Sequence, residues 1–164
     1  MKKIVTAMGL IALALTSCTE QPKEAAWIVD KFDDIKIIRY EVPEFENLSL
    51  NEKLLVYYLA ESAKCGRDII FDQNFKYNLT IRRALEQIYT TYEGDKSEAN
   101  FVAMEKYLKK MWLANGIHHH YSNDKFTPEF CREWFAEQLK GVDTGAVSHE
   151  QIVEILFNPT LYPS

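Results

Sequence analysis

Three consecutive histidines, His118, His119 and His120, are the side chains of this sequence best suited to chemistry. Imidazole is the commonest protein ligand for zinc and copper. Three neighbours cannot bind one ion together, because successive side chains on a helix point about 100° apart and on a strand only His118 and His120 share a face. Another ligand would be needed, and the only other histidine is His149. We therefore expect this chain to hold no metal and the tract to line the surface or a cleft.

The sequence at His149 and Glu150 begins like the zinc-protease helix motif H-E-x-x-H. In that motif two histidines one helical turn apart bind zinc and the glutamate acts as the base. Here Val153 occupies the second histidine position, and the variant H-E-x-x-G-H fails at the same place. A capped helix start explains these residues better, because Ser148 is followed three positions later by Gln151.

Charged side chains gather between residues 61 and 83, but their spacing does not converge on a substrate. Such groups are usually ion pairs on solvated helix faces. The sequence has no G-x-S-x-G motif, Walker loop, Rossmann glycine pattern or C-x-x-C pair. We predict no catalytic residue in this chain. The charged residues concerned are Glu61, Arg67, Asp68, Asp72, Arg82 and Arg83.

The beginning of the chain predicts export and a lipid anchor. Lys2 and Lys3 precede an apolar run, Ile4 to Leu15, that is too short to span a bilayer of roughly 30 Å. The run ends in L-T-S-C, which resembles the bacterial lipobox with Cys18 as the lipid attachment site. An ordinary signal peptide that contains a cysteine is the alternative. We expect a signal peptide at 1–17, a polar tether at 18–26 and one domain at 27–164.

The predicted lipoprotein is periplasmic or at the cell surface, and we expect an outer-membrane anchor because Thr19 offers no aspartate of the inner-membrane retention kind. Two further cysteines, Cys65 and Cys131, lie in an exported chain where a disulfide is permitted. The sequence leaves open whether they pair. The net charge is −5, and no basic patch favours nucleic acid as a partner.

Hydrophobic periodicity predicts a mainly α domain of about five helices with one early strand. The strand covers Ile35 to Val42, where apolar and polar residues alternate, and no second segment has an equally clear strand pattern. The first helix should begin with a capping box, Ser49 to Glu52, and end at Gly66 in a left-handed cap. Asn78 should cap the second helix, which stops at Gly94.

The third predicted helix places one apolar stripe toward the core and ends at Asn115. The fourth should begin with Pro128 at its first position. The fifth should begin at Ser148 and end before Pro159. The stripe of the third helix comprises Phe101, Met104, Leu108, Met111 and Trp112.

Several stretches, taken in order, resemble the N-terminal part of bacterial dipeptidyl peptidase III in the form found in Bacteroides-like organisms. The resemblance covers roughly Trp27 to Pro163, and no single motif in it is diagnostic. The stretches are I-K-I-I-R-Y-E-V-P at 35–43, L-L-V-Y-Y-L-A-E-S-A at 54–63, G-R-D-I-I-F-D-Q-N at 66–74, K-Y-N-L-T-I-R-R at 76–83 and N-G-I-H-H-H-Y-S-N-D-K-F-T-P at 115–128.

This resemblance implies a two-lobed zinc exopeptidase that removes dipeptides from the N-terminus of short peptides. In the family the zinc motif H-E-x-x-G-H and a downstream glutamate lie in the second lobe, so zinc belongs to the full-length enzyme and no counterpart of its ligands is expected here. The tract at 116–126 lies at the substrate cleft of the family. The resemblance implies that Tyr121 lines the subsite for the N-terminal residue of the peptide.

Two interpretations of function follow. In the first, the chain is the substrate-cleft part of a lipid-anchored dipeptidyl peptidase, is inactive alone and lacks its C-terminal lobe. Its ending at Pro163 and Ser164 reads like a connection to more protein, and the early strand needs sheet partners. In the second, the chain is a free-standing helical lipoprotein that binds peptides or partners without catalysis.

Overall fold

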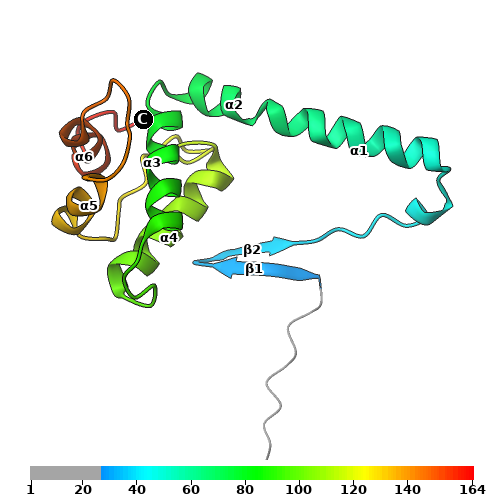
Figure 1. Ribbon diagram of the computed structural model, residues 1–164, viewed down its shortest axis with the longest axis horizontal. Coiled ribbons are helices and arrows are strands. Elements are labelled where there is room, and N and C mark those ends of the chain that lie inside the picture. Colours follow the sequence, from blue (N-terminus) through cyan, green and yellow to red (C-terminus); the bar gives the residue numbers. More distant parts are fainter. Residues whose placement is uncertain (1–26) are drawn as a thin grey trace, which may run out of the picture.

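The computed structural model describes residues 27–164. The expected signal peptide, Cys18 and the tether at 18–26 lie outside the described residues. The described part is mainly helical, with six α-helices and one two-stranded sheet, so the predicted fold class is confirmed. Figure 1 shows α3, α4, α5 and α6 grouped into one body, while α1 and the sheet extend from it.

The early strand is present as β2 (Ile35–Ile38), which is shorter than the predicted Ile35 to Val42. Its partner is β1 (Ile28–Phe32), which the sequence pattern does not single out. The two strands form an antiparallel hairpin in which Phe32 pairs with Ile35. Asp33 takes a positive φ of 55° in the tight turn between them, a conformation that aspartate tolerates. The early strand is therefore paired within this chain.

Helix α1 (Leu50–Cys65) begins with the predicted capping box. The Ser49 hydroxyl accepts from the Glu52 N–H, and the Glu52 carboxylate accepts from the Ser49 N–H at 2.8 Å. The prediction of a left-handed cap at Gly66 is wrong, since Gly66 has φ −78° and ψ −8°. The right-handed backbone at Gly66 lets a second, unpredicted helix, α2 (Arg67–Asn74), follow at once.

Helices α3 (Asn78–Thr91) and α4 (Ala99–Ala114) pack against each other and form the wall to which the other elements attach. Asn78 is not a cap but a buried residue of the first turn of α3. Asn115 ends α4 in the left-handed conformation with φ 56°, as its sequence favours. The predicted stripe of α4 is buried except for Trp112, which is 39% exposed because its indole N–H turns outward to the Glu86 carboxylate at 2.8 Å.

The last two helices are α5 (Arg132–Leu139) and α6 (His149–Phe157), which pack on each other. Pro128 does not open α5, because the chain stays irregular until Cys131 takes the N-cap position. The predicted start of α6 is confirmed, since the Ser148 hydroxyl accepts from the Gln151 N–H at 3.1 Å. Asn158 ends α6 before Pro159, as predicted.

One hydrophobic core lies between α3, α4, α5 and α6, and α2 contributes Phe71 to it. Its largest fully buried side chains include Phe101, Phe135, Leu108 and Ile152. No residue of α1 belongs to this core. Within the described part of the chain, no helix is both long and apolar enough to cross a membrane.

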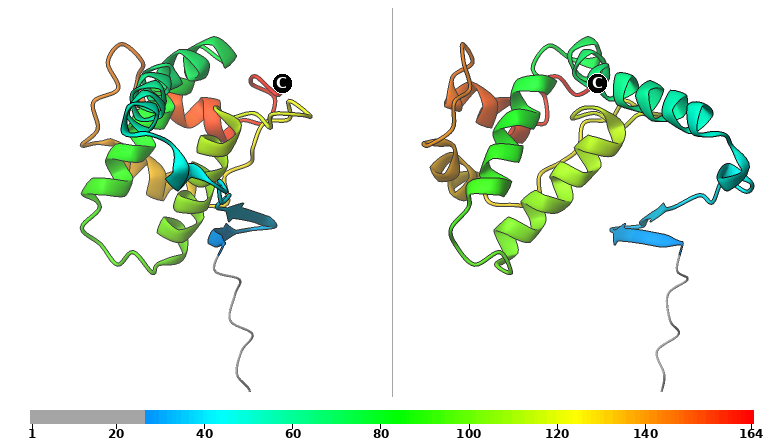
Figure 2. Two further views of the ribbon diagram at one scale, coloured as in Figure 1. Left: turned by 90° about the vertical axis from the view of Figure 1, so that its right-hand side faces the viewer. Right: turned by 45° about the vertical axis from the view of Figure 1, so that its right-hand side comes forward.

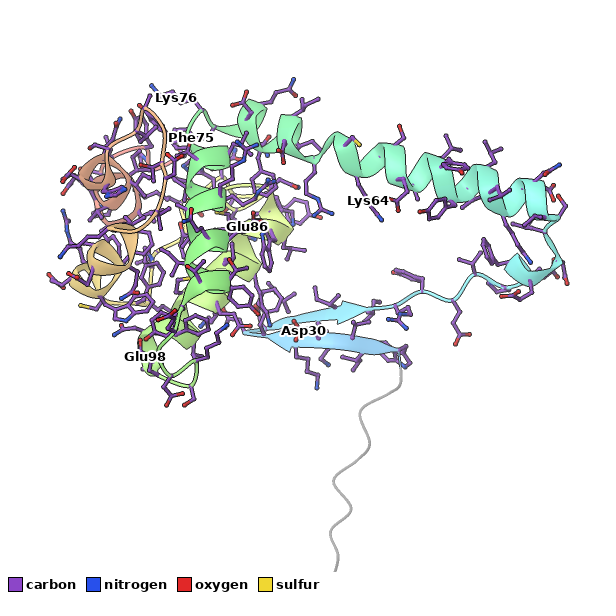
Figure 3. All side chains as sticks on the ribbon, viewed as in Figure 1. Asp30, Lys64, Phe75, Lys76, Glu86 and Glu98 are labelled. Carbon is purple, nitrogen blue, oxygen red and sulfur yellow. The ribbon has the colours of Figure 1, made fainter. Side chains whose placement is uncertain are left out.

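Helix α1 and the hairpin extend from the body toward the same side of α3 and α4 (Figure 1; Figure 2, right). Ion pairs attach the hairpin to α4: Lys109 lies 2.9 Å from Asp30, and Lys110 pairs with Asp33. Figure 3 shows Asp30 on the hairpin close to the end that meets the body. Each of these carboxyl groups has a pKa below its usual value, chiefly because it accepts a hydrogen bond from its lysine.

Candidate functional site

The histidine tract forms a hairpin-like loop, here called the histidine loop and defined as Ile117 to Phe126. The Phe126 N–H donates to the Ile117 carbonyl at 2.8 Å, and the His119 N–H donates to the Asp124 carbonyl at 2.8 Å. A backbone bridge pairs residues 118 and 125. The chain turns within residues 119–124, where Asn123 takes a positive φ of 61°. The three histidines therefore lie on a turning backbone, not on one extended strand.

Asn78 fixes the start of the histidine loop. Its side-chain oxygen accepts from the buried Ile117 N–H at 3.0 Å, and its amide nitrogen donates to the Asn115 carbonyl at 3.5 Å. Gly116 passes directly over this side chain. A Cβ atom at position 116 would lie 2.3 Å from the amide nitrogen of Asn78, so only glycine allows this close approach.

His118 is held by a polar and an aromatic contact. Its Nε2 lies 3.0 Å from the Tyr162 carbonyl oxygen, which can only accept, so Nε2 carries the proton. Its ring packs edge-on against Phe75, with 5.5 Å between centroids. Figure 3 shows Phe75 where α2 gives way to α3.

His119 has a structural role in the turn. Its Nδ1 accepts from the backbone N–H groups of Tyr121 and Ser122, each at 3.2 Å. Its ring stacks on that of His120 with a centroid distance of 4.7 Å. Among residues 27–164, no three His, Cys, Asp or Glu side chains come together as a metal site would require.

The histidine loop borders a hollow of about 520 Å³. None of the residues that line this hollow is Asp, Glu, Lys or Arg. A second hollow of about 300 Å³ lies toward the tip of the β-hairpin and shares His119 and His120 with the first. The larger hollow, here called the loop pocket, is polar with an aromatic wall. It is lined by Asn74, Phe75, Asn78, Ala114, Asn115, Gly116, His118, His119, His120, Asn123, Tyr162 and Ser164.

Tyr121 lies at the tip of the turn and is 85% exposed. Its ring packs against His120 at 4.2 Å between centroids and does not line the loop pocket. Because the tract turns, Ile117 and Tyr121 do not share one face: Ile117 is fully buried, while Tyr121 projects into solvent. The role of Tyr121 in binding a peptide stays a prediction.

His149 and Glu150 form the capped helix start that the sequence favours over a zinc motif. The His149 Nε2 lies 2.9 Å from the Val142 carbonyl, and Val153 is buried in the core. The Glu150 pKa is lowered, first by a backbone N–H bond and then by the Ser148 hydroxyl. His149 and Glu150 thus serve the start of α6.

The two cysteines do not form a disulfide. Cys65 and Cys131 are both free and exposed. The Cys131 thiol lies 2.8 Å from the Glu133 carboxylate and donates to it, which lowers the pKa of Glu133.

Several of the charged residues between 61 and 83 form ion pairs, as expected for solvated helix faces: Glu61 pairs with Lys64, and Asp68 pairs with Arg82 and Arg83. Asp68 on α2 accepts from Arg82 at 2.6 Å and from Arg83 at 2.9 Å. Both bonds hold the pKa of Asp68 below its usual value, with Arg82 the larger cause. Arg82 is buried, and its guanidinium lies 4.6 Å from the centroid of the Phe71 ring. Apart from its position in the helix, nothing in the sequence indicates this burial.

Sequence reasoning also missed Asn78, Lys125 and Tyr162, which shape the loop pocket. The sequence predicts Asn78 as a helix cap and assigns no separate role to Lys125. Tyr162 lies in the Pro-rich segment after α6, where no periodicity places it beside His118. The contacts of these residues span 30 to 44 positions along the chain, so a local sequence pattern does not show them.

No protein family model matches this chain, and a search of curated proteins finds no match either.

Proposed function

We propose that this chain is the N-terminal, substrate-cleft part of a zinc-dependent dipeptidyl peptidase of the dipeptidyl peptidase III kind, anchored to a membrane through Cys18. Its substrates are short peptides, from whose N-terminus the complete enzyme removes dipeptides. The resemblance of the ordered stretches from 35 to 128 suggests the family. Two features of the structure support the proposal: the exposed apolar side chains of α1 and the loop pocket.

The observation that carries the proposal is the exposure of α1. Leu54, Leu55, Val56 and Tyr57 are four consecutive apolar residues, all exposed. Successive side chains of a helix point about 100° apart, so this one turn of α1 has no polar side, whereas the turns before and after it carry polar and charged residues such as Glu52, Lys53 and Glu61. A large cluster of exposed apolar side chains usually marks a surface that contacts other protein. The chain therefore needs a further protein surface around α1, which a second lobe of the enzyme would supply.

The loop pocket supports the second part of the proposal. It lies at the tract whose counterpart in the family borders the cleft. Its volume of about 520 Å³ suits a few residues of a peptide, since small-molecule sites usually have about 300–1,000 Å³. Amide and imidazole groups on its walls can bond to peptide backbone groups, and the rings of Phe75 and Tyr162 offer apolar contact.

The described residues do not fit zinc. A catalytic zinc site needs three protein ligands and an open position for water. Among residues 27–164 no three His, Cys, Asp or Glu side chains come together, and His149 lies on α6, away from the histidine loop. The zinc, its ligands and the base would belong to the C-terminal lobe. The role of this chain is to bind and orient the peptide.

The body formed by α3 to α6 has its own core, and this favours one alternative. In that alternative the chain is a free-standing helical lipoprotein that binds peptides or partners without catalysis. Under it, α1 would be covered by a partner protein of another kind.

Expression in two pieces tests the proposal. This chain and a separately expressed C-terminal lobe of a dipeptidyl peptidase III are mixed with zinc, and release of a fluorophore from an arginyl-arginyl amide is measured. We expect chelator-sensitive turnover from the mixture and none from either piece. Turnover by this chain alone, or no binding between the pieces, would contradict the proposal. Peptide binding by this chain without binding of the lobe would favour the free-standing lipoprotein.

A further inference from the structure

Lys125 has a role that neither its sequence position nor the family resemblance assigns. Its ammonium lies at the C-terminal end of α6 and donates to the carbonyl oxygens of Ile155 at 3.0 Å, Asn158 at 2.5 Å and Leu161 at 2.6 Å. An ammonium has three protons, so each proton has one acceptor. The last carbonyls of a helix carry partial negative charge and favour a cation. Burial lowers the pKa of the Lys125 ammonium.

The backbone of Lys125 holds the segment that follows α6. Its N–H donates to the Pro163 carbonyl at 3.0 Å. Lys125 thus bonds to residues 161 and 163, on either side of Tyr162. Tyr162 has a positive φ of 53°, a conformation rare for residues other than glycine, which persists where surrounding bonds impose it.

The bend at Tyr162 builds one wall of the loop pocket. It directs the Tyr162 carbonyl to the His118 Nε2 and places the Tyr162 ring 5.0 Å from that of Phe75. Tyr162, Phe75 and His118 all line the pocket, whereas Lys125 does not. Because the carbonyl only accepts, it keeps the proton of His118 on Nε2 and leaves Nδ1 as an acceptor.

We propose that Lys125 is a positioning residue that holds Tyr162 in its bend and, through the Tyr162 carbonyl, fixes the ring orientation and tautomer of His118 in the pocket wall. Its relevance to peptide binding rests on the proposed function. The positioning itself does not.

The test compares Lys125→Met with a matched control, Lys140→Met. Methionine keeps most of the apolar stem but removes the three donors, while Lys140 has only an exposed ion pair with Glu137. The full chain is purified in detergent with 15N-labelled histidine, and the His118 ring signals are assigned with His118→Gln. We expect wild type and Lys140→Met to show one His118 tautomer, protonated at Nε2. We expect Lys125→Met to lose it and give averaged tautomer shifts.

An unchanged His118 signal in folded Lys125→Met would overturn the proposal. If that variant does not fold, the wild-type protein still provides a test through the side-chain 15N signal of Lys125. An ammonium bonded to three carbonyls exchanges its protons slowly and gives an observable signal, which Lys140 should lack. A Lys125 signal as exchange-broadened as that of Lys140 would also overturn the proposal. Neither measurement uses peptide or zinc, so its failure is distinct from failure of the proposed function.

Discussion

At the scale of single residues, the histidine loop depends on side chains that bond to backbone groups. Asn78 bonds to the backbone on both sides of Gly116, and His119 bonds to two N–H groups of its own turn. Together with the contact of His118 Nε2 with the Tyr162 carbonyl, these bonds fix the rings of His118 and His119 in the wall of the loop pocket.

Asn78→Ala should destabilise the protein strongly. The variant leaves the buried Ile117 N–H without an acceptor, which costs about 1–3 kcal/mol. Urea unfolding measures the loss. Asn74→Ala is the matched control, because Asn74 also donates to the Asn115 carbonyl but is exposed. Equal stability of the two variants would show that Asn78 does not fix the loop.

Asp68 should make stability depend on pH. Arg82, and to a lesser degree Arg83, lower its pKa in the folded state. Its contribution is therefore complete above the unfolded pKa of about 3.9 and is lost as pH falls through the lower folded pKa. Thermal unfolding of wild type and Asp68→Asn measures this. We expect the wild type to be more stable at neutral pH and the difference to narrow below about pH 4. A difference independent of pH would refute the assignment.

Tyr121 should contact the peptide in a complete enzyme. In a full-length relative, replacing the tyrosine that corresponds to Tyr121 by alanine should weaken the binding of dipeptide substrates by about 1–3 kcal/mol through lost apolar contact. Here Tyr121 is 85% exposed at the tip of the loop, so it is available for such a contact. The ratio kcat/KM measures the effect. An unchanged ratio would remove the assignment.

At the scale of elements, sequence patterns predicted helices whose ends carry local chemistry. Ser49 and Ser148 cap as expected, and Asn115 ends α4, because each interaction spans three or four residues. The patterns failed where the deciding contact is distant. Asn78 does not cap α3, because its side chain bonds to the backbone beside Gly116. Pro128 lies outside α5. The strand β1 has no clear pattern of its own and is defined by its pairing with β2. The loop pocket could not be predicted, since its walls come from α2, α3, the histidine loop and the segment after α6.

Helix α1 should be the least stable helix of the isolated chain. It has 16 residues, of which none is buried, and helices near this length are marginal in water without tertiary packing. Hydrogen exchange followed by mass spectrometry measures this. We expect the amides of α1 to exchange far faster than those of α4, which has equal length but lies in the core. Equal protection of the α1 and α4 amides would mean that α1 is stable without a further protein surface around it.

At the scale of the whole molecule, the fold has one well-packed body and two extensions with little packing of their own. The hairpin attaches through the ion pairs of Asp30 and Asp33 with α4, and α1 presents apolar side chains in every direction. Extensions of this kind lose little by moving onto another protein surface, because few contacts must be broken first. The two extensions therefore suit contact with a further protein surface, which under the proposed function is the second lobe of the enzyme.

A chimaera tests this central claim most directly. Residues 27–164 replace the corresponding N-terminal part of a full-length dipeptidyl peptidase III, and chelator-sensitive release of dipeptides is measured. A second chimaera with Leu55→Asp and Leu59→Asp on α1 serves as the matched control. We predict activity within about tenfold of the parent for the first chimaera, equivalent to about 1.4 kcal/mol, and a loss for the second because α1 would then bury charge. A folded first chimaera that binds zinc but releases no dipeptide would contradict the account.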